Sequence, residues 1–357
     1  ASTDPIGNLF LRHGPPSTDG ALPVLSGSHL DSQPAGGWLD GVYGVVAALE
    51  AVQSLKEKGV ALARPVEAVS WTNEEGSRFM PGVMGSSYYV ERLAVADFAD
   101  HRDPDGIRLG DALEALLAST PDLPVHQEPR PIAGLVEVHI EQGPILETEG
   151  KTIGVVEGVQ GMRWMEVTIQ GRTDHAGTTP LRQRRDAMLS ATRIVQALNE
   201  ALYDPDDVLR FTVGRFIAKP GSPNTVADEV VFTIDLRHPD DGVLERSLET
   251  IRRVTAEKAA PCEAVVHLHE SLEPVRFDPA IVDTVAAATD DLCLPARRMV
   301  SGAGHDAAVL AQRHACGMIF VPCHQGISHH PAENADEANL IAGTAVLAET
   351  LRRLASN

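Results

Sequence analysis

The sequence is poor in several residue types, and each shortage excludes a class of protein. Aromatic residues make up 4% of the 357 residues, and there are only four cysteines. No CxxC spacing groups those cysteines into a thiolate metal site, and they do not form the pattern of a disulfide framework. Basic residues are also few, because 30 Lys and Arg stand against 50 Asp and Glu, a formal net charge of −20. This acidic balance argues against nucleic acid and anionic membranes as partners.

Long hydrophobic runs are missing as well. No stretch approaches the ~18 apolar residues of a transmembrane helix, and no basic region followed by an apolar one opens the chain as a secretory signal would. Together with cysteines that read as reduced thiols, these features favour a cytoplasmic protein. The 43% of apolar residues is enough for buried cores. At about 100–200 residues per domain, the length predicts two or three domains, or one large α/β body with an insertion.

The first and last parts of the chain alternate between strands and helices. Apolar runs at 22–25, 66–72 and 135–140 predict strands, and apolar residues at helical spacing between 42 and 55 predict a helix. Helical segments near the C-terminus flank another apolar strand at 318–321. This alternation is typical of a mostly parallel sheet with helices on both faces.

The middle of the chain follows a different order. Its strands and helices succeed one another as β-α-β-β-α-β, which is typical of a small ferredoxin-like α+β unit. The predicted strands are 164–170, 211–216, 229–238 and 263–269, and the predicted helices are 187–198 and 244–254. We therefore predict an α/β protein whose mostly parallel-sheet domain, residues 1–159 and 273–357, is interrupted by a ferredoxin-like α+β domain at 160–272.

Histidines and carboxylates recur where the predicted strands end. The carboxyl ends of neighbouring parallel strands meet at one rim of a sheet, so these side chains are expected to converge. Ligation by His, Asp and Glu without thiolates suits Zn²⁺, Mn²⁺, Co²⁺ or Ni²⁺ in a catalytic site. One carboxylate can bridge two such ions about 3.5–4 Å apart, and the pair activates water for hydrolysis. The residues concerned are His29, Asp40, Glu74, Glu75, His139 and His329.

Each of these motifs alone has a simpler explanation. A His-X-Asp sequence is usually a loop histidine beside a cap, and two adjacent glutamates are usually solvated surface. Their recurrence at successive strand ends favours a site instead. Glu74 and Glu75 are informative because adjacent residues at a strand end point in different directions, so one can bind metal while the other carries a proton. Asp31 is expected to orient the His29 ring through its second nitrogen.

Nine short motifs, taken in order along almost the whole chain, make the sequence similar to a known family. It resembles the M20-type metallopeptidase superfamily, and within it the hydantoinase/carbamoylase branch of N-carbamoyl-L-amino-acid amidohydrolases, β-ureidopropionases and allantoate amidohydrolases. The motifs are GSHLDS at 27–32, GGWLDG at 36–41, NEEGSRF at 73–79, HIEQGP at 139–144, GRTDHAGTTP at 171–180, PNTV at 223–226, DLR at 235–237, SGAGHDA at 301–307 and GISH at 326–329.

The resemblance implies a role for each residue at the expected site. Asp40 matches the carboxylate that bridges two divalent ions. His29 and His139 complete one ion's ligands, and Glu75 with His329 the other's. Glu74 matches the general base that takes a proton from water and returns it to the leaving nitrogen.

The resemblance also implies substrate contacts. His175, from the inserted domain, matches a histidine that stabilises the developing oxyanion, in related dimers from the neighbouring subunit. Asn224 and Arg237 match substrate ligands, with Arg237 holding a carboxylate, and Gln142 and His305 match polar contacts in the same pocket. A surface ion pair of Arg237 with Asp235 is the simpler alternative for that arginine.

These matches imply a cytoplasmic homodimer, joined through the inserted lid and dimerisation domain, that hydrolyses the C–N bond of an N-carbamoyl-L-amino acid with two divalent ions per chain. The substrate is a small ureido acid with a carboxylate. His139 stands where peptidases of the superfamily carry a carboxylate, which favours ureido substrates over peptides. The alternatives are allantoate or β-ureidopropionate hydrolysis, then an aminoacylase or dipeptidase, and last a non-catalytic protein that binds a ureido metabolite.

Overall fold

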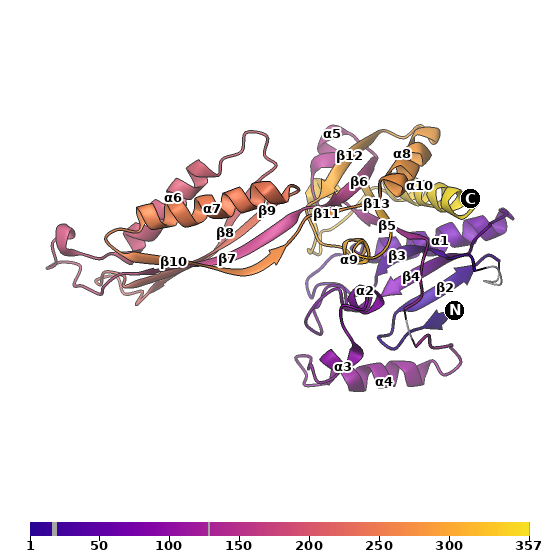
Figure 1. Ribbon diagram of the computed structural model, residues 1–357, viewed down its shortest axis with the longest axis horizontal. Coiled ribbons are helices and arrows are strands. Elements are labelled where there is room, and N and C mark those ends of the chain that lie inside the picture. The colour runs from indigo at the N-terminus through magenta and orange to yellow at the C-terminus, as the bar shows by residue number, and fades with distance from the viewer. Residues whose placement is uncertain (16–19, 128, 357) are drawn as a thin grey trace. The chain divides into compact units, whose positions relative to one another are not determined.

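The computed structural model describes residues 1–15, 20–127 and 129–356. Contacts between Cα atoms divide the chain into two compact units. We call Ala1–Val159 with Arg276–Asn357 the outer unit and Gln160–Val275 the inserted unit. The inserted unit thus ends three residues beyond the predicted boundary at 272. Figure 1 labels most of the helices and strands of both units.

The outer unit is built on a nine-stranded sheet, whose edge strand β11 begins at the last residue of the inserted unit. Its strand order is β1-β2-β4-β3-β5-β13-β6-β11, with β12 paired to β6. The strands are β1 (Ser2–Thr3), β2 (Leu9–His13), β3 (Val24–His29), β4 (Val66–Trp71), β5 (Gly134–Ile140), β6 (Ile153–Val159), β11 (Val275–Arg276), β12 (Ala296–Ser301) and β13 (Cys316–Val321).

The centre of this sheet is parallel. Strands β4, β3, β5 and β13 are neighbours that run in the same direction, whereas β2 lies antiparallel to β4 and β13 antiparallel to β6. The α/β class and the mostly parallel sheet are therefore confirmed, and antiparallel pairs join the outer strands β2 and β6 to the central four. Those four strands consist almost wholly of buried residues, as expected of parallel strands covered on both sides.

Helices cover both faces of the sheet. Gly343 of one helix faces the Val138 side chain, while the Ala307 amide of another binds the Glu137 carboxylate. Since adjacent residues of β5 point to opposite faces, these two helices, α10 and α9, lie on opposite sides. The helices of the outer unit are α1 (Val42–Glu57), α2 (Met84–Tyr89), α3 (Val95–Phe98), α4 (Leu109–Ser119), α5 (Ile145–Glu149), α8 (Pro279–Asp291), α9 (Asp306–Leu310) and α10 (Glu337–Ser356), with the short turn η3 (His324–Gly326).

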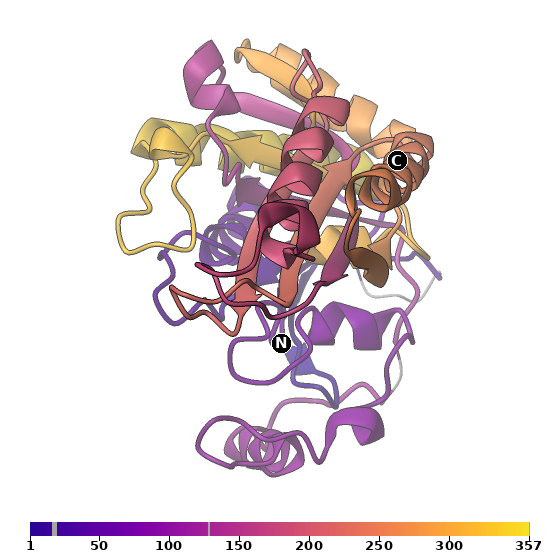
Figure 2. The same cartoon turned by 90° about the vertical axis from the view of Figure 1, so that its left-hand side faces the viewer.

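The inserted unit has the predicted β-α-β-β-α-β order. Its four strands form an antiparallel sheet in the order β10-β7-β9-β8, and α6 and α7 lie side by side along one face of it (Figure 1 and Figure 2). The elements are β7 (Gly161–Gln170), η2 (Leu181–Gln183), α6 (Ala187–Ala201), β8 (Arg210–Lys219), β9 (Glu229–His238), α7 (Asp241–Lys258) and β10 (Glu263–Leu272).

Capping and alternation explain this arrangement. The Asp186 and Asp240 carboxylates accept hydrogen bonds from amides in the first turns of α6 and α7, so each helix begins at its own aspartate. On β9, Val230, Phe232 and Ile234 point to the helices and are fully buried. Among the described residues of either unit, no helix is long and apolar enough to cross a membrane.

Candidate functional site

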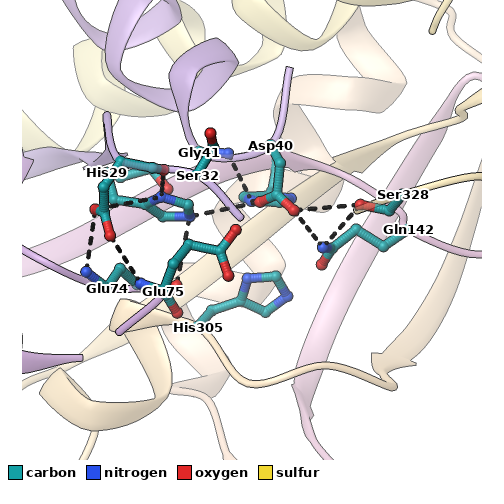
Figure 3. Close-up of polar contacts among 12 residues, drawn as sticks. His29, Ser32, Asp40, Gly41, Glu74, Glu75, Gln142, His305 and Ser328 are labelled. Carbon is teal, nitrogen blue, oxygen red and sulfur yellow. Dashed lines mark hydrogen bonds and ion pairs between the residues drawn. The ribbon is translucent and has the colours of Figure 1, made fainter. Parts of the chain in front are cut away.

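The predicted ligands of the outer unit meet at the carboxyl ends of its parallel strands. His29 is the last residue of β3, Glu74 and Glu75 follow β4, and His139 lies one residue before the end of β5. Asp40 lies two residues before the start of α1. Figure 3 shows most of these side chains pointing toward one another from their separate elements. The sheet thus places in one cluster residues that are up to 300 positions apart in the sequence, His29 and His329 among them.

The first group of donors consists of His29, Asp40 and His139, all buried. Their ligand atoms lie within 4.8 Å of one another. Nε2 of His139 lies 3.1 Å from Asp40 Oδ1, and Nε2 of His29 lies 3.5 Å from the same oxygen. These three side chains therefore surround one point with two ring nitrogens and a carboxylate oxygen.

The tautomers of the two histidines show what this point requires. Nδ1 of each ring lies 2.8 Å from a main-chain carbonyl, that of Asp31 for His29 and that of Ile140 for His139. A carbonyl can only accept, so Nδ1 carries the proton and Nε2 presents its lone pair on the side of Asp40, where Nε2 of His139 also accepts the Gly41 amide at 3.1 Å. Facing acceptors repel one another unless a cation lies between them. The geometry therefore fits a cation bound at Nε2. The hydrogen bond from Nδ1–H to a main-chain carbonyl fixes the orientation of each ring, as it commonly does for histidines that bind zinc.

A proton is the other cation that satisfies these contacts. Although burial opposes protonation, the Asp40 carboxylate raises the pKa of His29 and of His139 above the ordinary histidine value. Burial also opposes the charge on Asp40, but its hydrogen bonds with the two histidines hold the pKa of that carboxyl below its usual range. The cluster thus favours positive charge next to Asp40.

The second group of donors shares Asp40 with the first. Nε2 of His329 lies 3.1 Å from Asp40 Oδ2 and 3.6 Å from Glu75 Oε1. Within the described part of the chain, Glu75 Oε1 is buried without any hydrogen-bond partner, while Gln33 donates to its Oε2 at 2.7 Å. A buried carboxylate oxygen with no hydrogen bond is costly unless it binds a cation. Because Asp40 offers Oδ1 to one group and Oδ2 to the other, the two groups fit two divalent ions that share one carboxylate.

Glu74 belongs to neither group. Its Oε2 lies 3.6 Å from His29 Nε2, and the side chain is mostly buried. Burial and the nearby carboxylates of Asp306 and Glu75 raise the pKa of Glu74 well above the ordinary value, against the opposing influence of His29. A carboxylate with a raised pKa beside a metal position is suited to accept and return a proton.

The Asp31 carboxylate has a different role from the one expected. It accepts the main-chain amides of Glu74 at 3.1 Å and Glu75 at 3.0 Å, whereas the main-chain oxygen of Asp31 contacts the His29 ring. The nearer carboxylate oxygen stays 3.8 Å from that ring. The prediction that Asp31 orients His29 holds only for its backbone, because its side chain fixes the turn that carries both glutamates.

Two predicted substrate contacts of the outer unit lie against the ligands themselves. The Gln142 side-chain amide donates to Asp40 Oδ2 at 2.8 Å and to Ser328 Oγ at 3.1 Å. His305 is buried, with its ring centre 4.7 Å from that of His139 and its Nε2 3.1 Å from Ser301 Oγ. Burial and the neighbouring His139 lower the pKa of His305 well below the ordinary value, so this ring is neutral. Their roles toward substrate stay predictions.

The other three predicted residues belong to the inserted unit. His175 is exposed, and its Nδ1 accepts the amides of Gly177 at 3.0 Å and Thr178 at 3.2 Å. The proton is therefore on Nε2, where the ring can donate it to an oxyanion. The Ala176 amide binds the Asn224 carbonyl at 2.9 Å, so His175 and Asn224 lie in adjacent loops.

Arg237 makes the ion pair that was considered as its simpler role. Its Nε and Nη2 each lie 2.9 Å from an oxygen of Asp235, which also accepts the Trp164 indole N–H. The guanidinium is held in one orientation by this two-point contact and is partly exposed.

Several buried acids next to the site were not among the predicted residues. Glu137 accepts the Ser28 hydroxyl at 2.7 Å and the Ala307 amide at 2.9 Å. Burial and the charge of Glu137 raise the pKa of Asp306 to about 8. Glu333 accepts the amides of Leu39 and Asp40. Glu137 could have been found, because it lies two positions before His139 on β5 and so on the same face.

The chain is similar to known proteins over nearly its whole length. The family model for peptidase family M20/M25/M40 matches residues 25–353. An N-carbamoyl-L-amino-acid amidohydrolase from Rhizobium meliloti is 38% identical over 351 residues, 96% of this chain and 82% of the relative. An allantoate amidohydrolase from Escherichia coli is 37% identical over 357 residues, 99% and 86% of the two chains. A crystal structure of a hydantoinase/carbamoylase family amidase from Burkholderia multivorans superposes with a TM-score of 0.92 at 42% identity, covering 100% of this chain and 86% of that one.

Proposed function

This chain belongs to peptidase family M20/M25/M40, and from that premise we propose that it is a metal-dependent amidohydrolase acting on an N-carbamoyl-L-amino acid. Water would cleave the bond between the carbamoyl carbon and the amino nitrogen, giving the amino acid, CO₂ and ammonia. The observation that carries this proposal is the pair of donor groups sharing Asp40, with Glu74 beside them. Relatives named for this activity support the substrate class, at 34–38% identity over nearly the whole chain.

Two divalent ions, Zn²⁺, Mn²⁺, Co²⁺ or Ni²⁺, are the proposed cofactors. His29, Asp40 and His139 would hold one, and Asp40, Glu75 and His329 the other. When bound, such ions lower the pKa of water and polarise the substrate carbonyl. The mixed nitrogen and oxygen donors and the absence of thiolates from both groups match these metals.

The protein's own side chains would carry the proton and position the substrate. Glu74 accepts a proton from the attacking water and returns it to the leaving nitrogen. His175 donates its Nε2–H to the oxyanion. The planar fork of Arg237 binds the substrate carboxylate, and Asn224 makes a separate polar contact. Further polar contacts to the substrate would come from Gln142 and His305.

A second candidate is hydrolysis of allantoate, which is also a ureido acid with a carboxylate. Relatives named allantoate amidohydrolase, from Bacillus subtilis and Escherichia coli, are 35% and 37% identical to this chain. The metal groups and the base serve both reactions, so only the substrate separates them. The remaining enzymatic alternatives are hydrolysis of β-ureidopropionate (N-carbamoyl-β-alanine), of an acetylated amino acid or of a dipeptide. A non-catalytic binding protein is the least favoured, because the donors and the base are all in place.

The test is ammonia release by metal-depleted protein reconstituted separately with each of the four ions. The substrates would be N-carbamoyl-L-methionine, N-carbamoyl-β-alanine, allantoate, an N-acetyl amino acid and a dipeptide, with the amine product followed for the last two. We expect turnover of an N-carbamoyl-L-amino acid that depends on added metal. Turnover of allantoate alone would select the second candidate, and cleavage of the acetyl or peptide substrate alone would contradict a ureido substrate. Silence on all five with two bound ions would contradict the proposed activity.

Arg237 offers a test of how the substrate carboxylate is bound. In Arg237→Lys the positive charge remains, but the side chain can no longer bind the substrate carboxylate through two parallel hydrogen bonds. A hydrogen bond to a charged group contributes about 1.5–3 kcal/mol. We expect KM to rise roughly 10- to 100-fold with little change in kcat. The matched control is the same substrate with its carboxylate converted to an amide, which should react equally slowly with both proteins. An unchanged KM for the acid would remove Arg237 from carboxylate binding.

We also propose that the protein is a cytoplasmic homodimer joined through the inserted unit. Its four cysteines are free thiols in the structure, as a reducing compartment requires. Apolar side chains are exposed on strands of the inserted unit, among them Trp164, Ile217 and Val265. Light scattering after size-exclusion chromatography should give twice the chain mass of 38.2 kDa, and Val265→Glu should lower it. A mass of one chain for the unmodified protein would contradict the dimer.

A further inference from the structure

Glu333 is a buried carboxylate to which the proposed reaction gives no role. It is 1% exposed and lies four residues beyond His329. Its Oε1 accepts the amides of Leu39 at 2.9 Å and Asp40 at 3.0 Å, and its own carbonyl accepts the Trp38 indole N–H at 3.0 Å. Glu333 therefore ties the segment that ends at Asp40 to the loop that carries His329.

Close packing shows that this position is specific for the carboxylate. A Cβ added to Gly37 would lie 2.0 Å from the Glu333 carboxyl carbon and 2.1 Å from Oε1. The glycine therefore leaves room for the carboxylate, and the backbone of 37–40 wraps around it. Only an acceptor fits at Oε1, because two N–H groups point at it.

The other oxygen of Glu333, Oε2, faces the Ser328 hydroxyl, which has two carboxylate oxygens within hydrogen-bonding distance. Ser328 Oγ lies 2.9 Å from Glu333 Oε2 and 3.2 Å from Asp40 Oδ2, while Gln142 donates to it at 3.1 Å. A hydroxyl has a single proton, so it can donate to one carboxylate only. The shorter contact is with Glu333. Asp40 Oδ2, the oxygen nearest to His329, then accepts the Gln142 amide at 2.8 Å but not the Ser328 proton, so it keeps a lone pair for a cation.

We propose that Glu333 is a positioning residue for the metal position formed by Asp40, Glu75 and His329. It fixes the backbone of Asp40 and draws the Ser328 proton away from Asp40 Oδ2, so that this oxygen accepts the Gln142 amide but no second hydrogen bond and keeps a lone pair for the ion. This inference rests on the proposed function, since it requires two bound ions. The metal position formed by His29 and His139 uses Asp40 Oδ1, which the Ser328 hydroxyl does not contact, so the direction of the Ser328 proton should not change its affinity.

Glu333→Gln tests the direction of the Ser328 proton. The single oxygen of Gln must meet the two amides, so its NH₂ group faces Ser328 and donates to it. The hydroxyl then turns its proton to Asp40 Oδ2 and competes with the ion. Changes in such outer partners typically cost about 10- to 100-fold in metal affinity. We expect that loss at one of the two positions only, measured by equilibrium dialysis and by titrating the Co²⁺ absorption spectrum.

The matched control is Glu337→Gln, the same chemical change four residues further on at an exposed position. It should bind both ions as the unmodified chain does. The decisive variant is the double substitution Glu333→Gln with Ser328→Ala, which removes the misdirected hydroxyl. We expect it to bind the second ion more tightly than Glu333→Gln alone. A purely structural role of Glu333 predicts that the double variant is equally weak or weaker, and that result would overturn the inference.

The outcomes separate this inference from the proposed function. If the unmodified chain binds fewer than two ions, the proposed function fails and the inference with it. If it binds two ions and Glu333→Gln binds both with unchanged affinity, the inference alone fails. Should Glu333→Gln not fold, Gly37→Ala displaces the same carboxylate from the other side. Selective loss of one ion in that variant supports the inference, and unchanged binding of both overturns it.

Discussion

Glu74→Gln is expected to lower kcat roughly 100- to 10,000-fold, the usual contribution of a positioned general base. The amide is nearly isosteric but cannot accept the proton that water must lose. Glu74 lies outside both donor groups, so the variant should still bind two ions with affinities close to those of the unmodified protein. Ammonia release at saturating substrate and metal analysis of the same sample check both parts.

Glu74→Asp is the matched control, because it keeps the carboxylate and withdraws it by one methylene. We expect partial activity from it, above that of Glu74→Gln. Full activity in the glutamine variant would contradict the role of Glu74 as base. Loss of an ion from that variant would show instead that Glu74 helps to hold metal. This is the relevant alternative, because Glu74 lies 3.6 Å from His29, a proposed metal ligand.

The sequence predicted the fold because the two units have different periodicities. Apolar runs followed by helical spacing mark β3 and α1, and alternating strands with the β-α-β-β-α-β order mark the inserted unit. Periodicity does not state strand direction, and so the antiparallel pairs β2–β4 and β13–β6 could not be read from it. Those pairings depend on how the chain returns to the sheet, which is a property of the whole fold.

The convergence of His29, Glu75 and His139 could be predicted because parallel strands end at the same rim. The structure places their donor atoms together with those of Asp40 and His329, and their binding of metal stays a prediction. What the sequence could not give is the tautomer of each ring. That depends on single carbonyl contacts at 2.8 Å, which follow from local backbone geometry after each strand.

The residues that support the ligands were the hardest to find. Asp31 and Glu333 both act through main-chain amides, so nothing in the side chains of their partners signals the contact. Glu333 reaches Asp40 across almost 300 residues of sequence. Such a contact can be recognised only when the fold has brought the two loops together.

Asp40→Ala is expected to abolish binding at both metal positions, whereas His329→Ala should abolish it at one. The difference follows from the structure, because Asp40 presents Oδ1 to His29 and His139 and Oδ2 to His329. His329 contacts only the second of these oxygens. Metal content after dialysis should therefore fall to nearly none in Asp40→Ala and to one ion per chain in His329→Ala, and both variants should lose activity.

Thermal unfolding gives an independent measure that does not depend on turnover. An ion at 100 times its Kd stabilises the folded state by about 2.7 kcal/mol, so added metal should raise the Tm of the unmodified chain. We expect this rise to disappear in Asp40→Ala and to be reduced in His329→Ala. Equal metal content in the two variants would contradict a shared carboxylate, because the substitution of a residue that binds only one ion should cause the loss of only that ion. The difference between the two variants, more than the loss of activity in either, tests whether Asp40 joins the two positions.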